Sequence, residues 1–144
     1  EQYAERLRSL VSQYQLSDFV TFQSPIQRSE LPEFLGKFDA LLLPSIWAEP
    51  LARIMQEGLA CGMVVIGSAN GGTAETIVHG ENGLLFQAGD AVDLAKQIKY
   101  LLANPQMQRA LADGGVRTAK ERFDINTMVS EIEKYLEKVH AKAR

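Results

Sequence analysis

The sequence has little of what staples a chain or anchors it in a membrane. Cys61 is the single cysteine among 144 residues, so no disulfide can form within the chain, and we expect a reducing compartment. The longest apolar runs, such as residues 40–44 and 63–66, are far shorter than the roughly 20 residues that span a bilayer. The first residues are too charged for a signal peptide. We therefore expect a cytoplasmic chain without a transmembrane segment, with peripheral membrane association of the whole protein as an option.

Basic residues are also scarce, and clusters of metal ligands are missing. The chain carries 15 Lys and Arg residues against 18 Asp and Glu residues, a net charge of -3, without a dense basic block. A nucleic-acid partner is therefore not expected. His79 and His140 have no partner His, Cys or Asp at ligand spacing, so neither indicates zinc. No Ser-His-Asp or Cys-His set can be assembled, and neither a metal nor a cofactor is expected.

What the sequence does contain is an alternation of apolar strands and helices. Its length and its 46% hydrophobic residues predict a single domain across residues 1–144. Strands are expected at residues 19–22, 40–43, 64–66 and 84–86. Helices are expected near residues 3–16, 29–35, 50–60, 73–78, 90–103 and 106–122, and from 124 onward. The two middle strands are apolar without alternation, which predicts burial of both faces and a Rossmann-like, doubly wound parallel sheet in an α/β fold.

Two loops follow the middle strands, at the edge where parallel sheets bind ligands. The first leads into a helix, with Glu49 and Glu57 around the helix start and Pro50 in the expected first turn. The second, residues 67–72, is rich in glycine. Free N–H groups at a helix start attract anions, which suits a pyrophosphate. Because eight helical residues rise about 12 Å, the two carboxylates match hydroxyls on the sugars at either side of a pyrophosphate.

A second interpretation of the same spacing stays open. Glu49, Arg53 and Glu57 are four residues apart, which is also the pattern of an exposed ladder of salt bridges on an ordinary helix. In that ladder Arg53 pairs with Glu49 instead of touching a phosphate. Spacing alone favours the ladder.

Four stretches carry motifs in a fixed order. They are residues 49–62, 64–68, 71–75 and 80–86. An E-x7-E motif follows Leu-Leu-Pro-Ser, and Gly-Gly-x-x-Glu and Asn-Gly-Leu come after it. Together the stretches closely resemble the group 1 family of retaining glycosyltransferases with the GT-B fold, from about Tyr3 to the last helix. The chain departs from the family at Ala52, where glycine is usual, and at Gly58, a glycine within a helix.

The resemblance implies that residues 1–144 are most of the carboxyl-terminal, donor-binding domain. In the family, two further strands begin this domain, and the first leads to an Arg and a Lys that clamp the donor phosphates. An amino-terminal acceptor-binding domain precedes them. Without the two strands, apolar sheet edges are exposed. We therefore expect strands 19–22 and 40–43 to pair with each other or with a second copy, or the chain to belong to a longer polypeptide.

The resemblance also implies the roles of individual residues. Glu49 faces the hydroxyls of the donor sugar and is the expected catalytic residue, Glu57 faces the ribose, and backbone amides near 51–54 approach the diphosphate. The expected substrate-binding residues are Glu49, Pro50, Leu51, Ala52, Arg53, Ile54 and Glu57. The weaker candidates are Trp47, Gly71, Gly72 and Glu75. The alternative for Trp47 is a position in the core. The alternative for Glu75 is an interaction with the dipole of the helix in which it lies.

The implied activity is transfer of a hexose from a nucleoside diphosphate sugar to an acceptor, in carbohydrate biosynthesis. Catalysis would rest on electrostatic stabilisation of the departing diphosphate and on positioning of the sugar between two domains. The chain alone is expected to be inactive. The alternatives are a nonhydrolysing sugar-nucleotide epimerase and a non-catalytic nucleotide-binding or interaction domain.

Overall fold

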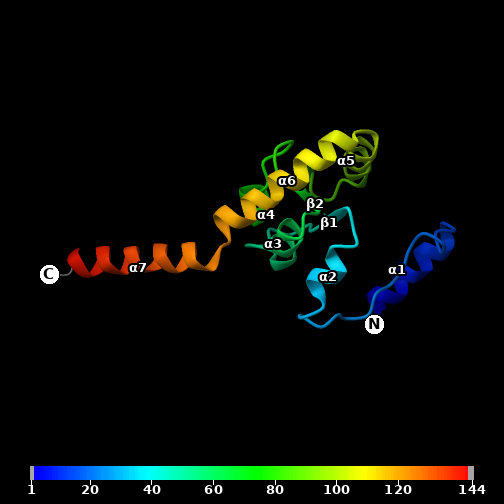
Figure 1. The fold of residues 1–144 in the computed structure, drawn as a ribbon. Coiled ribbons are helices and arrows are strands. Elements are labelled where there is room, and N and C mark those ends of the chain that lie inside the picture. Colours follow the sequence, from blue (N-terminus) through cyan, green and yellow to red (C-terminus); the bar gives the residue numbers. More distant parts are fainter. Residues whose placement is uncertain (1, 143–144) are drawn as a thin grey trace. The chain divides into compact units, whose positions relative to one another are not determined.

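The computed structural model describes residues 2–142, which fall into two compact units, residues 2–30 and 31–142. The first unit contains helix α1 (Gln2–Gln13), drawn in blue in Figure 1. The strand predicted at residues 19–22 is wrong, because these residues form a turn and a stretch without strand structure, and Phe19 is 83% exposed.

The second unit alternates strands and helices, as predicted. Its elements are α2 (Leu31–Leu35), β1 (Ala40–Leu43), α3 (Arg53–Ala60), β2 (Val64–Ser68), α4 (Gly71–Thr76), β3 (Leu84–Phe86), α5 (Ala91–Ala103), α6 (Pro105–Arg122) and α7 (Ile125–Lys142). Two predicted helix starts are wrong. Because α3 begins at Arg53, Pro50 lies in the loop before the helix, and α4 begins at Gly71, two residues earlier than predicted.

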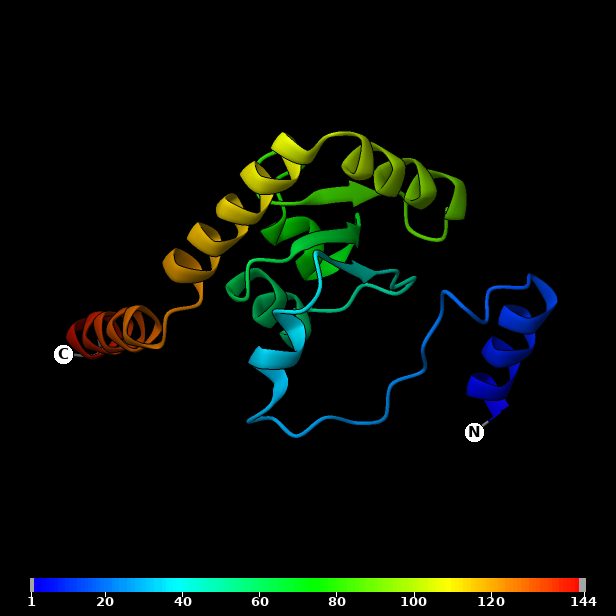
Figure 2. The same ribbon diagram turned by 45° about the vertical axis from the view of Figure 1, so that its right-hand side comes forward.

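The three strands form a parallel sheet in the order β1-β2-β3, and Figure 2 shows them side by side. Every residue of the central strand β2 is buried, as the sequence predicts. In β1 Leu42 is 42% exposed, so the prediction of two covered faces is wrong there. Strand β1 has one neighbour, β2, among the described strands.

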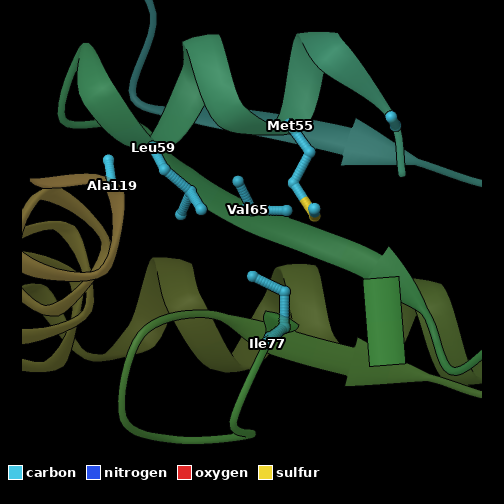
Figure 3. Close-up of a cluster of buried hydrophobic side chains, with 6 residues drawn as sticks. Met55, Leu59, Val65, Ile77 and Ala119 are labelled. Carbon is cyan, nitrogen blue, oxygen red and sulfur yellow. The ribbon is translucent and has the colours of Figure 1, made fainter. Parts of the chain in front are cut away.

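Helices cover both faces of the sheet, because neighbouring side chains of β2 point to opposite sides. Val65 faces a cluster with Met55 and Leu59 of α3, which Figure 3 shows together with Ile77 and Ala119. The opposite cluster joins β2 and β3 to α5 and α6. It consists of Val64, Ile66, Leu84, Phe86, Leu101 and Leu111. Helices on both faces of a parallel sheet confirm the doubly wound α/β class.

Several ends of helices follow the sequence signals. Asp90 caps α5, because its carboxylate accepts hydrogen bonds from the N–H groups of Val92 and Asp93 at 2.9 and 3.0 Å. The carboxylate of Asp93 accepts from the N–H group of Gln87 at 2.8 Å, which lowers the pKa of Asp93. Helix α3 ends at Ala60, and Gly62, two residues after this end, has a φ of 77°, in the left-handed region.

The last helix is amphipathic, as predicted, but its apolar stripe is not packed. No residue of α7 is buried. The exposed apolar residues of the stripe are Ile125, Met128, Val129, Ile132, Tyr135, Leu136 and Val139. Neither α7 nor any other helix among residues 2–142 is both long and apolar enough to cross a membrane.

Candidate functional site

The first part of the candidate site is the loop of residues 44–52, here called the Glu49 loop, which joins β1 to α3. Glu49 is half-buried in it, whereas Pro50 and Leu51 are exposed. Trp47 is 60% exposed, so the alternative that places it in the core is wrong. An exposed indole beside Glu49 leaves its ring free to stack on a planar or sugar-like ligand.

The second part is the start of α3, where the loop becomes helical. Its N-cap residue, Ala52, has extended backbone angles and offers no side-chain acceptor to the first turn. The backbone N–H groups at this end are therefore not capped by a side chain, the arrangement that favours an anion. The methyl group of Ala52 belongs to the buried cluster with Met55 and Leu59. An alanine in place of the family's glycine thus adds a methyl to the core.

The ladder of salt bridges is not formed. Glu49 lies before the helix, so helical spacing does not bring its side chain over Arg53. Among residues 2–142, the ion pair between Lys37 and Glu33, at 3.3 Å, is the only one. The side chain of Arg53 is exposed and is not paired with either glutamate of the motif.

Glu57 lies one turn further along α3, beside a cavity of about 440 Å³. The cavity is bounded by α3, by the end of α6 and by the first residues after it. Its lining residues are Gln56, Glu57, Ala60, Val116, Ala119, Lys120, Phe123 and Asp124. Its size lies within the range of small-molecule pockets. Lys120 is not among the predicted site residues, although positions 116, 119 and 120 share one face of α6.

The glycine-rich loop after β2 contacts the Glu49 loop. The N–H group of Gly72 donates to the carbonyl oxygen of Glu49 at 2.8 Å. A Cβ atom on Gly72 would overlap the carbonyl oxygen of Pro50, and one on Gly71 would overlap that of Glu49. The space beside the two glycines is thus occupied by the backbone of residues 49 and 50.

Glu75 and His79 lie outside the Glu49 loop and the start of α3. Glu75 is exposed near the end of α4, whose first turn holds no acidic residue, so the dipole alternative for it is wrong. The ring Nδ1 of His79 accepts a hydrogen bond from the N–H group of Leu85 at 3.0 Å. Residues 2–142 contain no group of three or more His, Cys, Asp or Glu side chains that could hold a metal ion.

Comparisons with known proteins decide the family. The family model for glycosyl transferases group 1 matches residues 1–117. The chain belongs to this family. It is 31% identical over 124 residues to N-acetyl-alpha-D-glucosaminyl L-malate synthase of Bacillus anthracis. The aligned residues are 86% of this chain and 32% of that enzyme. The chain spans about a third or less of the length of such curated relatives.

Solved structures place the group 1 glycosyltransferase chain in the GT-B class. Anabaena HepE in complex with UDP superimposes with a TM-score of 0.89 at 27% identity, over 95% of this chain and 37% of HepE. Sucrose-phosphate synthase from Thermosynechococcus elongatus superimposes with a TM-score of 0.86 at 31% identity. The superposition covers 96% of this chain and 34% of the synthase. The predicted fold, a GT-B carboxyl-terminal domain, is confirmed, and the roles of individual residues stay predictions.

Proposed function

We propose that the chain is the donor-binding part of a retaining glycosyltransferase that transfers a hexose from a nucleoside diphosphate sugar to an acceptor. The observation that carries the proposal is the start of α3, which no side chain caps, with Glu49 in the loop before it and Glu57 further along the same helix. That HepE, of similar fold, has been crystallised with UDP and with UDP-glucose supports a nucleotide-sugar ligand.

In the proposed complex each part of the site meets one part of the donor. The first N–H groups of α3, at Arg53 and Ile54, approach the diphosphate, whose negative charge they and the helix dipole stabilise. Glu49 accepts hydrogen bonds from hydroxyls of the transferred sugar, and Glu57 accepts them from the ribose. Carboxylates make strong acceptors for such hydroxyls, because a charged acceptor shortens and strengthens the bond.

The reaction breaks the bond between the anomeric carbon and the diphosphate oxygen, which keeps the electron pair. The acceptor hydroxyl forms the new bond on the same face, and its proton passes to the departing diphosphate. Catalysis comes from stabilising the departing diphosphate and from holding donor and acceptor together. We propose that an acceptor-binding domain and a cationic phosphate clamp, both outside residues 1–144, complete the site. We further propose that the whole enzyme works in the cytoplasm and that residues 1–144 alone do not transfer sugar.

An isotope-labelled donor tests the proposal. The intact protein is incubated with acceptors and a panel of labelled UDP-, GDP- and ADP-hexoses, and transfer of label, release of diphosphate and anomeric configuration of the product are measured. We expect transfer with retained configuration, and none with residues 1–144 alone. Label that returns in an epimerised sugar nucleotide would identify an epimerase. Binding without turnover would identify a non-catalytic domain, and inverted product would contradict retention.

A further inference from the structure

The segment of residues 68–72, which ends β2 and begins α4, holds the Glu49 loop at two points. The first is the carbonyl oxygen of Ser45, which accepts hydrogen bonds from Ser68 Oγ at 2.7 Å and from Asn70 Nδ2 at 3.2 Å. The side chain of Ser68 is fully buried, so its hydroxyl has protein partners in place of water. These bonds fix the beginning of the loop to the end of β2.

The second point of attachment is at Glu49 itself. Here the N–H group of Gly72 donates a hydrogen bond to the carbonyl oxygen of Glu49. The two backbone segments also approach so closely that a side chain at position 72 has no room. A Cβ atom there would overlap the carbonyl oxygen of Pro50 and lie 3.0 Å from the Cα atom of Leu51. Gly71 has a φ of 48° and a similar contact with Glu49. Glycine is therefore required at both positions.

Between the two attachments the loop has little support of its own. Ile46 and Trp47 are 77% and 60% exposed, and the N–H group of Glu49 donates to the carbonyl oxygen of Trp47 at 3.0 Å. Loops with few buried contacts are the least stable parts of a fold. The backbone position of Glu49 therefore depends on residues 68–72.

We propose that residues 68–72 act as a positioning clamp for Glu49, with Ser68 and Gly72 as positioning residues of the transfer reaction that do not touch the donor. The inference rests on the proposed function, because the clamp matters for catalysis only if Glu49 binds the donor sugar. A displacement of about 1 Å in a catalytic group can cost about a hundredfold in rate. Release of the clamp should therefore act on the sugar and on turnover, and far less on the free nucleotide.

Gly72→Ala tests the clamp, with Gly114→Ala as the matched control. In both variants the new methyl overlaps a backbone oxygen, that of Pro50 in the first and that of Glu81 in the second. UDP and UDP-glucose are titrated against the intact protein, and KM and kcat are measured with UDP-glucose. We expect Gly72→Ala to weaken UDP-glucose tenfold or more relative to UDP and to lower kcat. Gly114→Ala should lower the melting temperature while leaving the affinity ratio within twofold of the wild type. Equal ratios in the two variants would overturn the clamp.

A second variant tests the clamp without ligand and without a new steric clash. Ser68→Ala removes the buried hydrogen bond to Ser45. Thr118→Val removes a hydroxyl that donates to Gly114 within α6 at 3.0 Å and accepts from Asn82 Nδ2 at 2.9 Å, away from the Glu49 loop. Hydrogen exchange is followed in the peptide of residues 44–52. We expect at least tenfold faster exchange in Ser68→Ala and unchanged exchange in Thr118→Val. Unchanged exchange in both would refute the clamp even if the protein transfers sugar. Faster exchange in a protein that binds neither UDP nor UDP-glucose would instead refute the proposed function and the catalytic role of the clamp.

Discussion

Glu49 and Glu57 lie eight residues apart in one motif, but different kinds of structure hold them. Glu49 belongs to a loop whose carbonyl groups accept hydrogen bonds from Ser68, at the end of β2, and from Gly72, in the first turn of α4. Glu57 belongs to α3, whose backbone hydrogen bonds are local and whose buried face packs on the sheet. The position of one carboxylate therefore depends on tertiary contacts between loops, and that of the other on a helix and its core.

Helix α3 and the Glu49 loop should differ most in how much each contributes to the free energy of unfolding. Leu59 of α3 is fully buried, whereas Leu51 in the Glu49 loop is 42% exposed. We expect Leu59→Ala to lower the free energy of unfolding by about 2 to 5 kcal/mol, because it leaves a cavity in the core. The matched variant Leu51→Ala should cost less than about 1 kcal/mol. Urea denaturation of both proteins measures the difference, and equal costs would show that packing supports the loop as much as the helix.

The next effect concerns the carboxylate of the loop. If Glu49 binds hydroxyls of the donor sugar, Glu49→Ala should weaken UDP-glucose by about 1.5 to 3 kcal/mol, roughly tenfold or more, and lower kcat. Free UDP, which lacks the sugar, should bind as before. Calorimetric titration of the intact protein measures both affinities. Glu81→Ala, which removes an exposed glutamate outside the site, is the control. An equal loss for UDP and UDP-glucose would rule out a sugar-specific role for Glu49.

The carboxylate of the helix should show a different pattern of about the same size. Both UDP and UDP-glucose carry the ribose, so Glu57→Ala should weaken the two ligands by a similar factor, again roughly tenfold. The same titrations therefore distinguish the two glutamates by which ligand responds. A loss confined to UDP-glucose would move Glu57 from the ribose to the sugar, and no loss for either ligand would remove it from the site.

Local signals predicted the second unit well and failed where distant residues decide the structure. The strands at 40–43 and 84–86 are predicted to the residue, because each is a short apolar run between turn residues. The segment 19–22 has the composition of a strand but forms a turn and an irregular stretch. The start of α4 was missed because glycines indicate a loop, although Gly71 and Gly72 begin this helix.

The same division applies to the site. The E-x7-E motif and the glycine loop were visible as patterns, since each lies within a short stretch of sequence. The cavity beside Glu57 was not predicted, because Lys120 reaches it from α6, more than 60 residues later in the chain. The hydrogen bond from Ser68 to Ser45 likewise joins the end of β2 to the Glu49 loop, and no local pattern indicates it.

A change at Ala52, where the Glu49 loop meets α3, should have little effect on stability or on the affinity for UDP. Ala52→Gly restores the residue usual in the family. It removes a buried methyl, which costs about 0.8 kcal/mol, and glycine further favours the unfolded chain. At an N-cap, however, glycine is preferred over alanine by a comparable amount, so we expect the free energy of unfolding to change by less than about 1 kcal/mol. Because this methyl lies in the core, the affinity for UDP should stay within about twofold of the wild type. A tenfold gain in UDP affinity would show instead that the methyl obstructs the diphosphate at the start of α3.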